Sequence, residues 1–374
     1  MPDTAGWHGR VGPQWTRRPS VRRRNFLLAD RHTGQPVSDA TTRMVLSADG
    51  PAEQRFEAEL RTAMVETASG VCADLATVGD QLRDRRKALA TAAHEVGARA
   101  LASATHPTAD PDAVGFSPGP RYDRIAAVMG PLADQALVCG CHVHVGVPDR
   151  AAGVAVLDRI RPWLAVLLAT SANSPMWCGR DTGYASWRAQ SWNRLPTAGP
   201  ASAFGSLTAY DRVRREIVGS GAAIDDGMLY FDARLSERYP TIEVRVADVC
   251  LGVDDALLVA GLTRALVMTA LEQRATPAPD VPVELLRAAS WLASRYGLSG
   301  TLLDPVQRRA RPAHEVLGAL QQHVQSALHD SGDADLVADG LARLRRCGTG
   351  AVRQRAAWVD GGPGAVLDLV ALTG

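Results

Sequence analysis

One stretch of the chain decides its fold: Cys139-Gly140-Cys141-His142-Val143-His144-Val145-Gly146. It is rich in valine and bounded by glycines, a pattern that predicts a short buried strand. Side chains alternate between the two faces of a strand, so Cys139, Cys141, Val143 and Val145 share one face, and Gly140, His142, His144 and Gly146 share the other. Two buried imidazoles are costly unless other groups pair with them. The histidine face is therefore predicted to be the floor of an active site.

A second stretch, Thr241-Ile242-Glu243-Val244-Arg245-Val246-Ala247-Asp248, repeats this design. Its apolar side chains fall on one face, while Glu243 and Arg245 fall on the other. A sheet with one solvated face would give the same pattern. The combination of His-x-His on one strand with Glu-x-Arg on another favours a site, because sites bring titratable groups together.

The composition is that of a soluble globular protein, with 46% hydrophobic and 22% charged residues among 374. The net charge of +1 provides no overall field to attract nucleic acid or a membrane. The arginines near the N-terminus precede no apolar segment, so we expect no signal peptide and a cytoplasmic protein. The uncharged run after Pro162 is interrupted at residues 173–175, which indicates a buried helix rather than a membrane span.

The six cysteines are scattered, and we expect mostly buried, reduced thiols. Cys139 and Cys141 stand two residues apart on one strand face, a poor geometry for a disulfide. Together with His142 and His144 they form a Cys-x-Cys-His-x-His run that suggests zinc. Strand alternation separates the thiols from the imidazoles, so only a non-strand conformation would allow a zinc site.

The order of elements predicts an α+β fold, with helices packed on one face of a largely antiparallel sheet. Residues 1–20 are expected to form an irregular extension before a single domain at 21–374. Strands are predicted near residues 26–30, 139–146, 228–233 and 241–246, and helices over 74–97 (or on to 101, where a short strand follows), 123–137, 154–171, 208–220, 254–273, 282–296, 305–330 and 334–346. The segment 174–206 is long, irregular and rich in tryptophan, which is typical of a functional loop.

The loop Gly179-Arg180-Asp181-Thr182-Gly183-Tyr184-Ala185-Ser186-Trp187-Arg188 lies within that segment. Its backbone amides, hydroxyls and guanidinium groups suit phosphate oxygens. A solvated surface loop has the same composition, so the loop alone does not decide between the two interpretations.

Taken in order, these motifs resemble those of the carboxylate–amine ligase family, the type 2 glutamate–cysteine ligases. The resemblance rests on Val65-Glu66-Thr67, Thr105-His106-Pro107, Cys139 to Gly146, Gly179 to Gly183, Thr197-Ala198-Gly199-Pro200, Asp232-x-Arg234, Thr241 to Asp248, Arg295-Tyr296-Gly297-Leu298 and Gly348-Thr349-Gly350-Ala351. It implies a fold like the catalytic domain of glutamine synthetase: an antiparallel sheet forming a funnel, with helices outside. The chain itself predicts a helical C-terminal block from Asp254 onward, and we expect a homodimer.

The resemblance also implies an activity, the joining of a small carboxylate to an amine with ATP and Mg²⁺ or Mn²⁺. The metal-side residues would be Glu66, His142 and Glu243, with His144 beside them. Phosphate or substrate carboxylate would be bound by Arg188, Arg234, Arg245 and Thr182. An acyl phosphate needs a carboxylate held near the γ-phosphate while cations neutralise both, and oxygen ligands with an imidazole suit either metal.

The chain departs from the family pattern at its first strand. The family reads Gly-Val-Glu-Glu-Glu-Phe-Leu-Leu-Val-Asp, where this chain reads Val21-Arg22-Arg23-Arg24-Asn25-Phe26-Leu27-Leu28-Ala29-Asp30. Arg23 and Asn25 therefore replace two carboxylates on the funnel face. A guanidinium cannot ligate a cation and would repel it.

Three interpretations follow. In the first, the chain is an ATP-dependent ligase of altered substrate that uses fewer metal ions. Arginines, Arg23 among them, contact phosphate directly, and Asn25 contacts substrate or phosphate. Alternatively, it is an amide hydrolase or acyl transferase without ATP, in which His142 or His144 is the base and Arg23 holds a substrate carboxylate. The third interpretation is a partner protein without catalytic activity, because a fold does not fix a function.

Overall fold

The computed structural model describes residues 19–48 and 56–373. For residues 19–24 it describes the backbone alone. The extension expected at residues 1–18 lies outside the described residues, whereas Pro19 and Ser20 already belong to the first strand.

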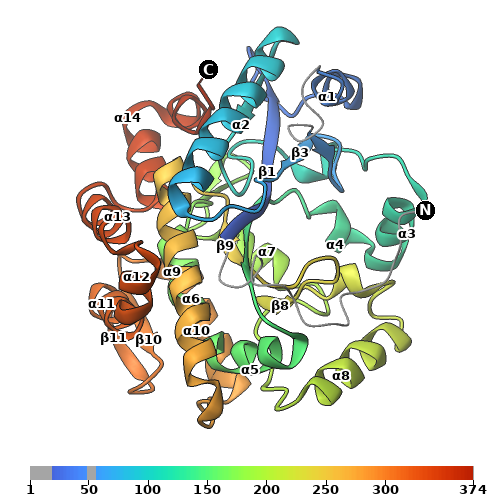
Figure 1. Cartoon of the computed structure of the whole chain (residues 1–374). Helices are drawn as coiled ribbons and strands as arrows, with labels where there is room; N and C mark the ends of the chain where they lie inside the picture. The colour runs from blue at the N-terminus through green and yellow to red at the C-terminus, as the bar shows by residue number, and fades with distance from the viewer. Residues whose placement is uncertain (1–18, 49–55, 374) are drawn as a thin grey trace.

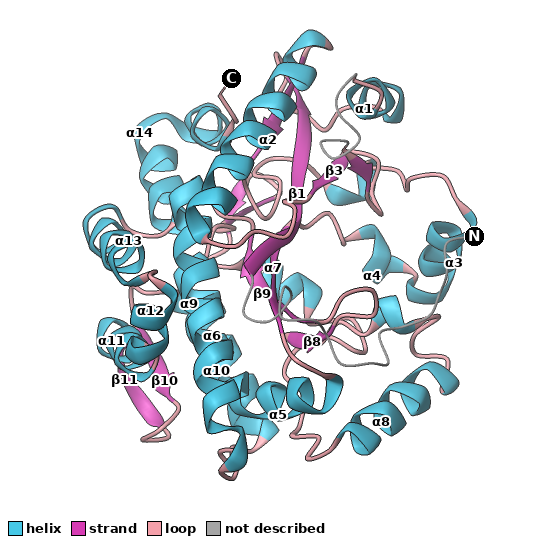
Figure 2. Ribbon diagram, in the orientation of Figure 1, coloured by secondary structure: helices cyan, strands magenta, loops and turns pink. Residues whose placement is uncertain are grey.

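The centre of the described chain is a seven-stranded antiparallel sheet (Figures 1 and 2). Its strand order is β2-β3-β1-β5-β9-β8. Strand β4 pairs with the C-terminal part of β1, from Leu27 to Asp30. The strands are β1 (Pro19–Asp30), β2 (Glu57–Ala58), β3 (Met64–Thr67), β4 (Ala98–Leu101), β5 (Gly140–Gly146), β8 (Ala233–Leu235) and β9 (Thr241–Asp248). The two strands predicted to carry the site are therefore direct neighbours in the middle of the sheet.

Helices cover the apolar face of these strands. Helix α9 (Val253–Glu272) is buried almost all round and packs with α2 (Leu75–Glu95), α5 (Arg150–Ile160) and α6 (Leu164–Ser171). Val143 and Val145 of β5 and Val244 of β9 join this core, as their alternation predicts. The predicted α+β class is confirmed.

The remaining helices lie around this centre. In Figure 1 the C-terminal helices stack on the left, outside α9, and α1, α3, α4 and α8 lie on the right. They are α1 (Asp39–Leu46), α3 (Pro120–Met129), α4 (Pro131–Asp134), α7 (Trp187–Trp192), α8 (Leu207–Gly219), α10 (Val283–Tyr296), α11 (Ala313–His323), α12 (Gln325–Ser331), α13 (Ala334–Cys347) and α14 (Gly350–Val370); small hairpins are β6 (Met176–Trp177) with β7 (Arg180–Asp181) and β10 (Thr301–Asp304) with β11 (Arg309–Pro312). No helix among the described residues has the length and apolar character needed to cross a bilayer.

Several predicted elements need correction. The helix expected over 305–330 is instead the β10–β11 hairpin followed by α11 and α12. The Asp304 carboxylate accepts hydrogen bonds from the amides of Val306 and Gln307 and so forms a turn. The strand expected over 228–233 begins only at Ala233, and the helix over 123–137 is interrupted at Gly130, whose φ of +52° cannot continue a helix.

Candidate functional site

The two histidines of β5 lie on the face of the sheet opposite the apolar core. His142 and His144 are 7% and 4% exposed, and Cys141, Val143 and Val145 point to the other side into the core. His144 lies directly across from Glu243 in the β5–β9 register. The predicted sharing of faces is therefore confirmed, and the imidazoles are nearly removed from solvent.

Glu243 is the centre of the charged groups on this face. Its Oε2 accepts a hydrogen bond of 2.8 Å from Arg234 Nε, and its Oε1 accepts one from Arg245 Nη1. Nδ1 of His142 lies 3.4 Å from Oε1, and Nε2 of His144 lies 3.9 Å from it. Four side chains from the three strands β5, β8 and β9 thus meet one carboxylate.

Burial opposes the ionisation of Glu243, but Arg245 and Arg234 outweigh it and hold the pKa of this carboxyl well below its ordinary value. Burial likewise opposes the charge of Arg234, and Glu243 raises the pKa of that guanidinium. The cluster is therefore an ionised carboxylate between two guanidinium groups, with a net charge of +1 apart from the histidines.

Neighbouring backbone and rings fix the remaining atoms of this cluster. Nη1 of Arg234 donates to the carbonyls of Asp226 and Leu229, so β8 and the short turn before it hold the guanidinium. Nδ1 of His144 lies 2.9 Å from Thr241 Oγ1, and its ring meets Tyr239 edge-on. Such contacts orient a side chain before any ligand arrives.

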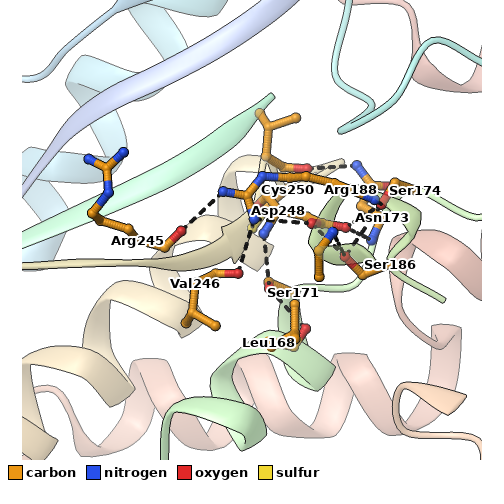
Figure 3. A network of polar contacts seen from close by, with 12 residues as sticks. Leu168, Ser171, Asn173, Ser174, Ser186, Arg188, Arg245, Val246, Asp248 and Cys250 are labelled. Carbon is orange, nitrogen blue, oxygen red and sulfur yellow. Dashed lines mark hydrogen bonds and ion pairs between the residues drawn. The ribbon is translucent and has the colours of Figure 1, made fainter. Parts of the chain in front are cut away.

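Arg188 lies near Gly140 in a second polar network, which extends to Asp248 (Figure 3). Its guanidinium donates to the carbonyls of Arg245 and Val246, and Nη1 lies 3.7 Å from the Asp248 carboxylate. A Cβ at Gly140 would lie 2.7 Å from Arg188 Nη2, which explains the glycine before the histidines. Arg188 thus ties α7 to β9, and its phosphate-binding role stays a prediction.

Asp248 anchors the rest of that network. Burial raises the pKa of this carboxyl, although Arg188 opposes the rise. The carboxylate accepts hydrogen bonds from the hydroxyls of Ser174 and Ser186 and from the amide of Asn173 (Figure 3). The long loop after α6 is therefore tied to the end of β9, so it is ordered and close to the site.

The first strand brings Asn25 and Glu66 to the edge of this face. The two residues are directly paired in the β1–β3 register, and both are buried. Asn25 Oδ1 has no hydrogen-bond partner among the described residues. The Arg23 backbone pairs with His142, but the predicted role of its side chain lies outside what is described.

No three His, Cys, Asp or Glu side chains of residues 19–48 and 56–373 are grouped so as to hold a metal ion. The assignment of Glu66, His142 and Glu243 as metal ligands accordingly remains a prediction. Thr182 donates its hydroxyl hydrogen bond to the Pro175 carbonyl within the β6–β7 hairpin. None of its hydrogen bonds in the described structure joins it to the sheet.

Asp232 lies next to this cluster, although it was predicted only as part of the Asp232-x-Arg234 match and not as a site residue. The Arg245 amide donates a hydrogen bond of 2.8 Å to the Asp232 carbonyl, so the two residues face each other across the β8–β9 edge. Asp232 lines a small cavity together with Arg188, Trp192, Asn193, Tyr230 and Arg245. Its spacing of two residues from Arg234, matching Glu243-x-Arg245, was the sequence signal that could have identified it.

Comparison with known proteins agrees with this geometry. The sequence profile of Glutamate-cysteine ligase family 2 (GCS2) matches residues 25–360. A Frankia alni protein that carries the name glutamate–cysteine ligase 2-2 is 49% identical over 306 residues, 81% of this chain and 79% of that protein. A Streptomyces avermitilis protein named in the same way, as 2-1, is 46% identical over 88% of this chain and 91% of its own.

Solved structures share the fold at low sequence identity. The glutamate–cysteine ligase of Francisella tularensis, determined in complex with AMP, has a TM-score of 0.71 at 12% identity, over 94% of this chain and 87% of that one. A bifunctional glutathione synthetase from Pasteurella multocida gives 0.70 at 13%, over 94% and 52%. With its fold shared by these ligases and its sequence matched from Asn25 onward, this chain is a ligase that belongs to glutamate–cysteine ligase family 2.

Proposed function

We propose that the protein is an ATP-dependent ligase that joins a small, amino-acid-like carboxylate to an amine through an acyl phosphate. The observation that carries this proposal is the cluster on the sheet face: Glu243 holds Arg234 and Arg245 beside His142 and His144. Family membership supports the reaction class, and the AMP bound to the Francisella tularensis ligase supports the use of a nucleotide.

The described side chains do not fit the divalent cation that the family implies. Both Glu243 oxygens accept hydrogen bonds from guanidinium groups. Oxygen donors remain at Asn25 and Glu66, but they do not complete a group of three acidic, histidine or cysteine ligands. A guanidinium next to a cation site repels the ion. We therefore assign no step to a metal.

In this proposal, guanidinium groups neutralise the charge that develops during phosphoryl transfer to the carboxylate. Arg245 and Arg234 are suited to this role because Glu243 holds both guanidinium groups in place. The three groups together carry one net positive charge. Arg23, Arg188 and Thr182 are proposed as further phosphate or carboxylate contacts, and Asn25 as a substrate contact.

The histidines are proposed to move protons. An imidazole is the side chain best matched to acid–base work near neutral pH. His142 lies within 3.4 Å of both Arg245 and Glu243, so a proton at its ring responds directly to the charges of the cluster. His144, held at Thr241, is proposed as its neighbour in the same role.

The experiment is a product assay with ATP, L-glutamate and L-cysteine, with and without Mg²⁺. ADP, phosphate and an amide product that depend on both amino acids would support the proposal. Formation of AMP instead of ADP would contradict the acyl phosphate. Conversion of an amide without any nucleotide would favour the hydrolase or acyl transferase. Arg245→Ala should abolish ADP formation, whereas Arg43→Ala, which removes a surface ion pair with Asp39, should not.

A further inference from the structure

We propose that Asp232 binds the ammonium group of the amine substrate and accepts the proton that this group must lose before it can attack. The inference rests on the proposed ligase function and deepens it, because it names a cationic amine as the occupant of one cavity. It concerns a residue outside the Glu243 cluster.

The backbone holds Asp232 in one place. Its amide donates a hydrogen bond of 3.0 Å to the Gly199 carbonyl, and its carbonyl accepts one from the Arg245 amide. Gly199 has a φ of +97°, a conformation that other residues rarely adopt. The Thr197 hydroxyl, two residues earlier, accepts a hydrogen bond from the Tyr230 amide. The turn at 197–199 thus positions both cavity residues, Tyr230 and Asp232.

The Asp232 carboxylate has no hydrogen bond or ion pair among the described residues, although two guanidinium groups line the same cavity. Both are engaged elsewhere. Arg188 donates to the carbonyls of Arg245 and Val246, and Arg245 donates to Glu243. Asp232 as a whole is half-buried and lines the cavity. A carboxylate that has lost water and has no hydrogen-bond partner is costly, and an ammonium ion would remove that cost.

The cavity also offers aromatic rings to a cation. The rings of Trp192 and Tyr230 lie with their centroids 4.7 Å apart, and both line the cavity beside Asp232. The faces of such rings attract ammonium groups. The Arg245 guanidinium already lies over the Tyr230 ring at 6.0 Å, so the Asp232 carboxylate and the Trp192 ring are the groups left to attract an amine.

The charges that face Asp232 suit proton transfer near neutral pH. Burial raises the pKa of its carboxyl to about 7, and Arg188 opposes that rise. Arg245 and the Tyr230 hydroxyl are the other ionisable groups of the cavity wall. A base works best when its pKa lies near the working pH. An ordinary aspartate would be a far weaker base.

The proposed step balances as follows. The ammonium group gives one proton to Asp232, and the nitrogen lone pair attacks the acyl carbon. The C–N bond forms, and the C–O bond to phosphate breaks with its electron pair leaving on phosphate. The second nitrogen proton passes to the departing phosphate, and Asp232 returns its proton to solvent.

The test compares two nucleophiles in the full-length protein, with ATP and L-glutamate present. Hydroxylamine is unprotonated at neutral pH and needs no base, whereas L-cysteine is an ammonium ion. Asp232→Asn should lower the rate with cysteine by about 10²-fold, the usual contribution of a general base. Formation of the hydroxamate should stay within about twofold. Asp232→Glu should restore part of the cysteine rate, and the exposed Glu237→Gln on the same hairpin should change neither rate.

The outcomes separate the two proposals. Wild-type protein that forms neither product would contradict the proposed function. If wild-type protein forms both, and Asp232→Asn loses both equally or neither, the role of Asp232 is overturned. A circular dichroism spectrum and thermal midpoint that match wild type show that the variant is folded. Trp192→Leu adds a second readout: it should raise KM for cysteine and leave KM for ATP unchanged.

Discussion

Arg234 Nε lies 2.8 Å from Oε2 of Glu243, and this buried ion pair joins β8 to β9 on the face that carries both strand histidines. Glu243 also holds Arg245, so one carboxylate compensates two buried guanidinium groups. Removing one partner of such a cluster leaves the remaining charges buried and unpaired. The resulting loss of folding stability is larger than the net contribution of the ion pair itself.

Glu243→Gln should therefore lower the free energy of unfolding by about 3 kcal/mol, the size expected for an uncompensated buried charge. The measurement is urea unfolding, in which the midpoint shifts at constant slope. The matched control is Glu315→Gln, since the ion pair of Glu315 with Arg311 is exposed and should contribute less than about 1 kcal/mol. Equal decreases in the free energy of unfolding in the two variants would show that Glu243 stabilises the fold no more than a surface carboxylate does.

The same cluster predicts a dependence on pH. The pKa of Glu243 is lowered on folding, so its stabilisation is fully present above the unfolded value of 4.5 and is lost as the pH falls toward the folded value. The two histidines beside Glu243 change charge between pH 8 and 5, so the test is made below pH 4.5. There the stability difference between wild type and Glu243→Gln should shrink as the pH falls. A difference that grows below pH 4.5 would refute the direction of the shift.

His142→Ala should reduce turnover by about 10²-fold or more, as expected for loss of a catalytic acid–base group. The ring lies 3.4 Å from both Glu243 and Arg245 and is nearly buried. His314→Ala, at an exposed position of α11, is the control and should leave turnover unchanged. Turnover per folded molecule is the quantity to compare. A folded His142 variant with normal turnover would remove this residue from the site.

Cys139→Ala and Cys141→Ala should each cost on the order of 1 kcal/mol of stability and leave activity per folded molecule intact. Both thiols are fully buried in apolar surroundings, on the face opposite the histidines. Thermal unfolding and turnover measure the two effects separately. Loss of bound zinc in either variant, detected by elemental analysis, would instead support the zinc site.

Arg23→Glu with Asn25→Glu tests what replaced the family's carboxylates. If Arg23 binds a phosphate or substrate oxyanion, the variant places like charges together and should lose native turnover, with Arg23 contributing roughly 2–5 kcal/mol. If the two residues only disable a metal site, the variant should bind Mn²⁺ beside Glu66, His142 and Glu243. We expect the first result. Titration calorimetry with Mn²⁺ and turnover, measured on both proteins, decide between them; undiminished turnover in the variant would exclude a role for Arg23 in the chemistry.

Much of the site could be predicted from strand periodicity. Alternation correctly placed His142 with His144, and Glu243 with Arg245, because a strand has only two faces. The predicted strand over residues 241–246 was confirmed as β9. The helices near 74–97 and 254–273 were confirmed as α2 and α9, since long periodic segments carry a strong local signal.

Contacts between distant segments could not be predicted in the same way. No local pattern shows that the backbone carbonyls of β9 bind Arg188, or that Gly199 and Arg245 fix the Asp232 backbone between them. The prediction of one helix over 305–330 was wrong for a related reason. The side chain of Asp304 forms a turn with the amides of Val306 and Gln307, although the spacing of apolar residues is that of a helix.

The sequence by itself determined which residues share a face and which strands carry the charges. That Arg23 and Asn25 replace family carboxylates stays a prediction from the resemblance to the family. Only the tertiary structure decided that Glu243 pairs with two arginines while the Asp232 carboxylate forms no hydrogen bond or ion pair among the described residues. The physical reason is that alternation follows from backbone geometry within a few residues. The pairing of a charge instead depends on burial and on which distant groups the packed fold brings within hydrogen-bond distance.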